Sequence, residues 1–369
     1  MSSLALGIVG LPNVGKSTLF QALTRMQVPA ENYPFCTIDP NVGIVEVPDR
    51  RLDRLWEAVV PARERMVPTT VEFVDIAGLV EGASQGEGLG NQFLARIRET
   101  DAVVHIIRCF HDPEVAHPYE RADPLRDREV VERELIMADR EVVEGRMERI
   151  AKKAASGEKE ARQELVLLQR LLERMERGEP ARREDPGQAE EGLLRSYNLL
   201  TAKPVLYVAN IGEEDLEGGS EAAEELTEAV RASEPGARTI ALCAQIEAEV
   251  AQLPDEEQAA YLEAMGLEQS GLVRLIQTGY GLLGLVTFFT IGEEEVRAWT
   301  VRQGATAPEA AGKVHSDFQE GFIRADAISF EAFTGFASLK EARAAGKLRS
   351  EGRDYVVRDG DILFFHART

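Results

Sequence analysis

Residues 10–17 constrain the fold of this chain more than any other segment. They read Gly-Leu-Pro-Asn-Val-Gly-Lys-Ser and match GxxxxGK[ST], the pattern of a phosphate-binding loop. The apolar run Leu4–Val9 predicts a strand before the loop, and Thr18–Met26 is expected to form a helix after it. This order of strand, loop and helix is the context that the motif requires. The sequence therefore predicts an α/β fold with a P-loop at the end of its first strand.

The chemistry of the loop follows from its residue types. Glycines let backbone N–H groups curl around phosphate oxygens, and the N-terminus of the following helix adds positive potential. Lys16 can reach the β- and γ-phosphates of a nucleoside triphosphate, and the Ser17 hydroxyl can ligate Mg²⁺. The residues of this loop expected to bind the nucleotide are Asn13, Val14, Gly15, Lys16, Ser17 and Thr18.

A second motif, Asp75-Ile-Ala-Gly78, follows its own strand candidate. The Asp75 carboxylate is expected to hold the hydration shell of Mg²⁺, and the Gly78 N–H to sense the γ-phosphate. Thr37, between the two motifs, is predicted as a further Mg²⁺ ligand when triphosphate is bound. Leu79 stands where a Ras-like enzyme has the glutamine that orients the attacking water. Because leucine cannot hydrogen-bond to water, another group must position it.

The other apolar runs predict the rest of the sheet and a helical insertion within it. Several are continuous runs of Val, Ile and Leu, which are typical of strands buried on both faces of a parallel sheet. Residues 123–199 read instead as helices with heptad-like apolar seams and a turn at Gly157. Such a hairpin is either packed on the domain or a projecting arm that touches a partner. The expected strands are Gly43–Val47, Val71–Val74, Ala102–Arg108, Pro204–Ala209 and Thr239–Cys243, and the two seams are Val131, Leu135, Ala138, Val142 and Leu165, Leu168, Leu172, Met175.

The last ninety or so residues change character. Aromatic residues become frequent between short strand-like runs, which indicates a separate α+β module. The expected strands of this module are Val286–Thr290, Val296–Val301 and Ile362–Phe365.

Composition excludes several classes of protein. The chain has 42 Lys and Arg against 64 Asp and Glu, a formal net charge of −22, which excludes a uniformly basic nucleic-acid coat. The acid excess is concentrated in residues 192–280, whereas the insertion and residues 281–369 are nearly balanced and can approach a polyanion. Three dispersed cysteines argue against a disulfide scaffold or a zinc module. We find no membrane-spanning run and no signal peptide, so a cytoplasmic protein is expected.

The segment that would read the base follows the strand Pro204–Ala209. A guanine-reading P-loop enzyme has Asn-Lys-x-Asp there, whereas this chain has Asn-Ile-Gly-Glu at residues 210–213. The aspartate of the guanine motif accepts hydrogen bonds from N1–H and the 2-amino group, and adenine has neither donor. Glu213 is longer and can swing aside, so ATP is expected to bind more tightly than GTP. The expected base pocket comprises Asn210, Ile211, Glu213, Cys243 and Ala244.

Together these motifs resemble the YchF/Obg-like ATPase family of translation-factor-class P-loop NTPases. The resemblance covers nearly the whole chain. It includes Phe35–Pro40, Phe73–Leu79, Gly86–Phe93 and Ile97–Thr100, as well as Arg297–Thr300, Gly304–Pro308 and Gly321–Ala325, which are similar to a TGS domain. It implies a Ras-like G-domain at residues 1–122 and 200–280, a coiled-coil-like helical insertion at 123–199, and a β-grasp TGS domain at 281–369.

The resemblance also implies a function. It predicts a monomeric, Mg²⁺-dependent hydrolase that converts ATP to ADP and phosphate, with the ribosome or ribosomal RNA as partner. Asn13 falls at a P-loop position that helps bind K⁺ in related enzymes, so K⁺ stimulation is expected. The family implicates a histidine in a mobile loop, and the corresponding residue here is His117. With Lys16 of the P-loop and Gly78 of the second motif, His117 completes the set of predicted catalytic residues.

Three alternatives remain open at this point. The first is a GTPase switch of the same fold, which base preference would discriminate. The second is a nucleotide-gated ribosome- or RNA-binding module whose hydrolysis is incidental. The third is a small-molecule kinase, against which the lack of a second acceptor-binding motif argues.

Overall fold

A computed structural model of the chain describes residues 4–26, 41–59, 65–76, 89–292, 294–336 and 339–368. It comprises two compact units. The first consists of Met1–Val45 and Glu72–Leu275, and the second of Glu46–Val71 and Ile276–Thr369.

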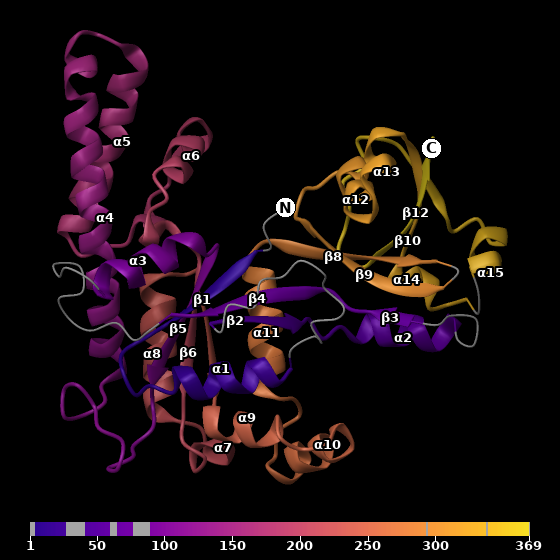
Figure 1. Cartoon of the computed structure of the whole chain (residues 1–369), viewed down its shortest axis with the longest axis horizontal. Helices are drawn as coiled ribbons and strands as arrows, with labels where there is room; N and C mark the ends of the chain where they lie inside the picture. Colours follow the sequence, from indigo (N-terminus) through magenta and orange to yellow (C-terminus); the bar gives the residue numbers. More distant parts are fainter. Residues whose placement is uncertain are drawn as a thin grey trace. The chain divides into compact units, whose positions relative to one another are not determined.

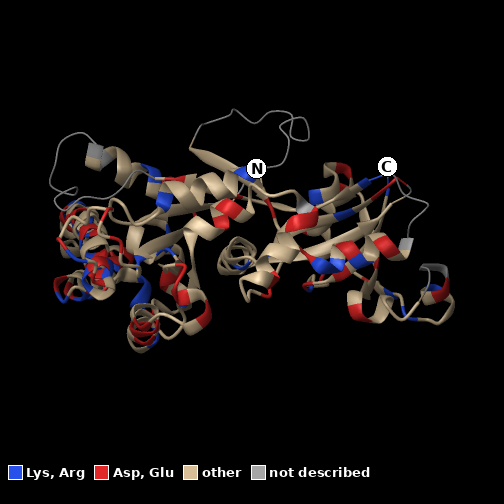
Figure 2. Cartoon of the chain, turned by 90° about the horizontal axis from the view of Figure 1, so that it is seen from below, with Lys and Arg blue, Asp and Glu red and all other residues tan. Residues whose placement is uncertain are grey.

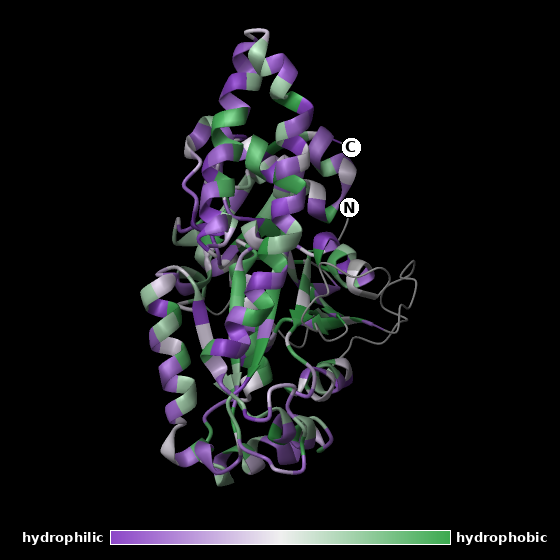
Figure 3. Ribbon diagram, turned by 90° about the vertical axis from the view of Figure 1, so that its left-hand side faces the viewer, coloured by the Kyte–Doolittle hydropathy of each residue, from purple (hydrophilic) through white to green (hydrophobic). Residues whose placement is uncertain are grey.

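The first unit is built on a six-stranded sheet with the order β2-β4-β1-β5-β6-β7. The neighbouring pairs β4–β1, β1–β5, β5–β6 and β6–β7 are all parallel. Every residue of β1, β5 and β6 is buried, which confirms the parallel sheet predicted from the apolar runs, and these strands are drawn mostly green in Figure 3. The strands are β1 (Ala5–Val9), β2 (Val42–Glu46), β4 (Thr70–Asp75), β5 (Ala102–Arg108), β6 (Val205–Asn210) and β7 (Arg238–Leu242).

Helices surround this sheet (Figure 1). The carboxyl ends of neighbouring parallel strands lie at one edge, so the segments after β1, β5, β6 and β7 meet there.

No helix among the described residues has the length and apolar character needed to cross a membrane. The helices and 3₁₀ turns are α1 (Lys16–Arg25), α3 (Leu89–Glu99), α4 (Pro124–Ala155), α5 (Lys159–Glu176), η2 (Ala181–Arg183), α6 (Gly187–Ser196), η3 (Leu200–Ala202), α7 (Asp215–Gly218), α8 (Glu221–Ser233), α9 (Ala244–Val250), α10 (Asp255–Ala264) and α11 (Gly271–Leu282), the last of which continues into the second unit.

The insertion is the helical hairpin of α4 and α5, which Figure 1 shows extending away from the sheet of the first unit. Gly157 lies between the helices with φ of 98°, a conformation that favours glycine, so the predicted turn is confirmed. The predicted seam of α4 is wrong in part, because the buried cluster of the hairpin uses Ile136, Val143 and Ile150, which are seven residues apart. The base of α4 also contacts β5, α8 and η3, so its first apolar residues serve a second interface.

The second unit contains a mixed six-stranded sheet with the order β11-β10-β12-β8-β9-β3. The pairs β10–β11, β10–β12 and β8–β9 are antiparallel, whereas β12–β8 and β3–β9 are parallel. The expected strands of this module are therefore confirmed. Its elements are β3 (Arg65–Val67), β8 (Leu285–Ile291), β9 (Glu295–Arg302), β10 (Phe322–Ser329), β11 (Arg349–Glu351), β12 (Asp361–Ala367), α2 (Arg50–Val59), α12 (Ala307–Val314), α13 (Ser316–Glu320), α14 (Phe330–Phe333) and α15 (Leu339–Ala344).

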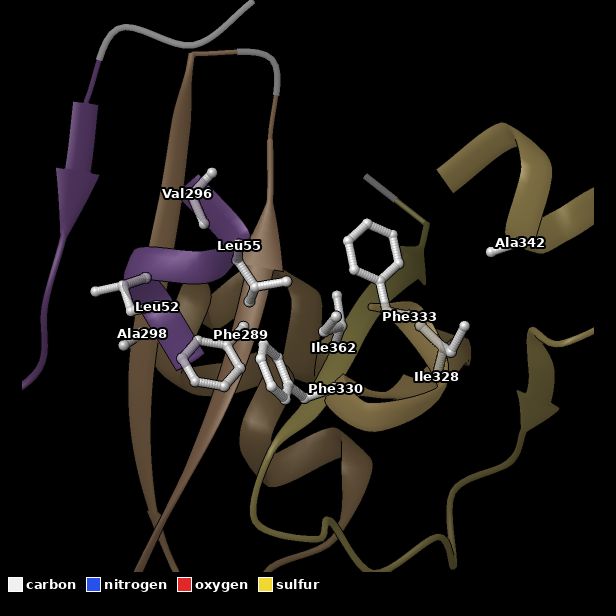
Figure 4. Packing of buried hydrophobic residues seen from close by; sticks show 10 residues of the cluster. All are labelled: Leu52, Leu55, Phe289, Val296, Ala298, Ile328, Phe330, Phe333, Ala342 and Ile362. Carbon is white, nitrogen blue, oxygen red and sulfur yellow. The ribbon is translucent and has the colours of Figure 1, made fainter. Parts of the chain in front are cut away.

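The segment Glu46–Val71 belongs to the second unit, although the expected ranges place it in the P-loop domain. It contributes β3 to the edge of the sheet and α2 to one of the cores. Leu52 and Leu55 of α2 are almost fully buried in a cluster with Phe289, Phe330 and Ile362 (Figure 4). The Arg51 guanidinium also donates to the Asp359 carboxylate at 2.6 Å. The second unit is thus assembled from two distant stretches of the chain.

Candidate functional site

The P-loop adopts the conformation that its glycine pattern predicts. Gly15 has φ of 96° and precedes α1, and Asn13 also lies in the left-handed region with φ of 60°. A Cβ atom at Gly15 would lie 2.3 Å from Nδ2 of Asn210. Both this close approach and the positive φ exclude a larger residue at this position. The loop therefore leads directly into the N-terminus of α1, where backbone N–H groups and the helix dipole favour an anion.

Lys16 lies at the first position of α1 and is only 7% exposed. Its ammonium donates to the carbonyl oxygen of Leu11 at 2.6 Å, across the P-loop. Burial lowers the pKa of Lys16 to about 8, and the nearby Asp75 carboxylate opposes this shift. Phosphate groups would supply the negative charge that this buried amine lacks.

Asn210 joins the P-loop to the segment after β7. Its Nδ2 donates to the carbonyl oxygen of Val14 at 2.9 Å, and its Oδ1 accepts from the N–H of Ala244 at 2.9 Å. The residue is buried at the end of β6. Asn210 therefore positions two walls of the site, a role that its predicted contact with adenine did not include.

A cavity of about 490 Å³ opens at this edge of the sheet. Eight of the predicted binding residues line it: Asn13, Gly15, Thr18, Asn210, Ile211, Glu213, Cys243 and Ala244. Val14 and Lys16 are buried beside it, and Ser17 is exposed on the first turn of α1. The structure thus brings the predicted phosphate and base segments together around one cavity.

Gln245, which follows Cys243 and Ala244 in the loop expected to close the base pocket, also lines the cavity. Other lining residues were not predicted: Phe110, His111, Asp112, Pro113 and Val115 from the segment after β5, together with Gly212 and Glu214. The signal that could have found the first group is positional. Residues that follow a central parallel strand lie at the ligand-binding edge, and residues 109–117 directly follow β5.

His117 occupies a different environment from the one expected of a catalytic histidine. Its Nε2 lies 2.8 Å from Oδ2 of Asp127, its Nδ1 accepts from the N–H of Tyr119 at 3.2 Å, and its side chain is 2% exposed. It is not among the described residues that line the cavity. The ring must leave both partners before it can position a water molecule at the nucleotide.

The predicted Mg²⁺ ligands are described only in part. Ser17 and Asp75 supply a hydroxyl and a carboxylate, which are the oxygen donors that Mg²⁺ prefers. Burial raises the pKa of Asp75, and the nearby Lys16 ammonium opposes this shift. Thr37 and Gly78 lie outside the described residues.

Comparison with known proteins identifies close similarities over the whole length. A family model described as "50S ribosome-binding GTPase" matches residues 5–143, and one described as "Protein of unknown function (DUF933)" matches residues 285–368. Proteins named "Ribosome-binding ATPase YchF" are similar. The one from Escherichia coli O157:H7 is 49% identical over 361 residues, covering 97% of this chain and 98% of that protein. The one from Bacillus subtilis is 49% identical, covering 98% and 99%.

A solved structure agrees with this similarity. The "Structure of the Schizosaccharomyces pombe YchF GTPase" superposes with a TM-score of 0.88 at 36% sequence identity, and covers 99% of this chain and 98% of that chain. The fold similarity therefore extends through both compact units.

Proposed function

The chain belongs to the YchF family, and from this premise we propose that it is a ribosome-binding ATPase that hydrolyses ATP to ADP and phosphate. The nucleotide lies in the cavity between the P-loop and the segments after β5, β6 and β7. Because ribosomes occupy the cytoplasm, we propose that the protein acts there. We also propose that it is a monomer.

The side chains around the cavity divide the catalytic work. Lys16 exchanges its bond to the Leu11 carbonyl for the β- and γ-phosphates and neutralises the charge that develops on them. Ser17, Thr37 and Asp75 would hold Mg²⁺, which would offset the negative charge of the phosphates. Gly78, which follows Asp75 in the second motif, would sense the γ-phosphate through its N–H.

Two further roles rest on the family resemblance. K⁺ would be bound through Oδ1 of Asn13, whose Nδ2 donates to the carbonyl oxygen of Ala116 at 3.0 Å. His117 would position the attacking water after separating from Asp127.

The observation that carries the preference for adenine is the place of Glu213. Glu213 lines the cavity together with Asn210, which lies three residues earlier. A guanine-reading enzyme has an aspartate at the position of Glu213. The names of the similar proteins differ in the base, since the bacterial relatives are called ATPases and the fission-yeast protein a GTPase. Base preference therefore has to be measured on this protein.

We expect ATP to bind about 5- to 150-fold more tightly than GTP, because an unpaired guanine donor costs about 1–3 kcal/mol. Titration calorimetry with ATP, GTP, ADP and GDP on the full chain measures this ratio. Equal or tighter binding of GTP would favour the GTPase alternative.

The tip of the hairpin, defined as residues 149–162, is a candidate ribosome contact. Figure 2 shows both signs of charge interspersed over the hairpin. The exposed charged residues of the tip are nevertheless mostly basic. They are Arg149, Lys152, Lys153, Lys159 and Arg162 against Glu158 and Glu160. In a chain with a formal net charge of −22, such a local excess suits the phosphate backbone of ribosomal RNA.

Replacing Lys152, Lys153 and Lys159 by glutamine should weaken ribosome co-sedimentation and lower the slope of log K against log salt by about 2. ATP hydrolysis without ribosomes should not change. The control replaces Arg133, Arg140 and Arg195 by glutamine, since these residues are also exposed but lie outside the tip. If both triple variants bind ribosomes alike, the tip is not the contact. If the wild-type protein does not bind, ribosome binding itself is refuted.

A further inference from the structure

We propose that Arg108 is a positioning residue for nucleotide binding, which holds residues 110–116 as a preformed wall of the cavity. This inference rests on the ATP-binding function proposed above and names a residue on which that function depends.

The Arg108 guanidinium fastens this wall at three points. Arg108 is the last residue of β5 and is 3% exposed. Its Nε, Nη2 and Nη1 donate to the carbonyl oxygens of Phe110, Asp112 and Val115 at 3.3, 2.9 and 2.9 Å respectively. Its guanidinium carbon also lies 4.4 Å from the centre of the Phe110 ring. A planar fork of fixed geometry thus sets the path of six consecutive residues.

The wall has weaker supports of its own. Oδ1 of Asp112 accepts from the N–H of Glu114 at 2.8 Å, and the carbonyl oxygen of Ala116 accepts from Asn13 of the P-loop at 3.0 Å. Most side chains of this segment are exposed or half-buried, so little packing holds it. Without Arg108, the segment would gain conformations that do not line the cavity.

The position of Arg108 connects this wall with the base pocket. In the register of β5 and β6, Arg108 lies opposite Asn210, whose side chain joins the P-loop to the segment after β7. The wall and Glu213 line the same cavity. A preformed wall spares the nucleotide the entropic cost of ordering it, and it restricts the base to one position against Glu213.

The test compares Arg108→Met and Arg108→Lys with wild type by calorimetry and steady-state hydrolysis. We expect Arg108→Met to raise KM and Kd for ATP by about 10-fold, with kcat changed by less than about twofold. The ratio of GTP to ATP dissociation constants should fall. Arg108→Lys should be intermediate, since an ammonium cannot reach three carbonyls in the guanidinium geometry.

Arg274→Met is a control for the loss of an arginine that bonds to a backbone carbonyl, although Arg274 is exposed. Its guanidinium also donates to a backbone carbonyl, that of Ala241 at 2.7 Å, but Arg274 is not among the described residues lining the nucleotide cavity. It should leave KM unchanged.

The proposal would be overturned if folded Arg108→Met had the Kd and the base selectivity of wild type. A decrease in kcat alone would also overturn it, because such a decrease indicates only a smaller folded fraction. If Arg108→Met does not fold, the same comparison decides on Arg108→Lys. Failure of wild type to prefer ATP refutes the proposed function instead, and the effect of Arg108 can then be read with GTP.

Discussion

Lys16→Met should lose ATP hydrolysis by at least about 100-fold, because it removes the preorganised charge at the transferring phosphates. The variant should nevertheless remain folded. The lowered pKa of Lys16, about 8, means that burial disfavours the charged amine in the folded state. Methionine keeps the aliphatic stem and removes that penalty, so the thermal midpoint should be maintained or should rise. Steady-state hydrolysis and calorimetric unfolding measure the two effects.

Lys203→Met is the control for this variant. Lys203 is also a buried lysine of the first unit, 9% exposed, and its amine donates to the backbone carbonyls of Arg98 and Thr100. Because Lys203 is not among the described residues that line the cavity, Lys203→Met should leave kcat nearly unchanged. Equal losses of kcat in both variants would show that the Lys16 effect is structural.

Nucleotide binding should also depend on pH through Lys16. Its pKa of about 8 in the free protein should rise when phosphates bind, so the complex holds more protons than the free protein. Affinity for ATP should therefore fall as pH increases through 8. Calorimetry in buffers of different ionisation enthalpy should detect proton uptake near pH 8 in wild type and less of it in Lys16→Met.

Asn210→Asp should weaken ATP binding by about 10- to 100-fold. The substitution preserves the shape of the side chain and the acceptor for Ala244. It replaces the donor to Val14, however, so that a carboxylate oxygen faces the Val14 carbonyl oxygen across the present 2.9 Å bond. The P-loop should move away from the segment after β7. Titration calorimetry with ATP and ADP measures the loss.

Asn198→Asp provides the comparison for the new charge. Asn198 also donates its side-chain amide to a backbone carbonyl, that of Arg98 at 3.4 Å, but it is exposed and is not among the described residues that line the cavity. Its nucleotide affinity should equal that of wild type. If Asn210→Asp binds ATP normally, the bridge between the two walls is dispensable.

Local sequence patterns determined much of this molecule. A glycine-rich loop between an apolar strand and a helix specifies its own backbone, because the positive φ of Gly15 and the strand before it are encoded within a few residues. The continuous apolar runs likewise specified β5 and β6, and the segment at Asn210 could be placed beside the P-loop because parallel strands share a carboxyl edge.

Only the tertiary structure decided how distant segments combine. The placement of α2 and β3 with the C-terminal strands depends on the packing of Leu52 and Leu55 against Phe289 and Ile362. The spacing of two leucines predicts a buried helix face but not the residues that it contacts. The contact of His117 with Asp127 likewise depends on how the segment after β5 enters α4. Arg108 shows the same limit in a single residue. Its place at the end of a strand was readable from the sequence, but its three carbonyl partners were not, since backbone carbonyls carry no residue identity.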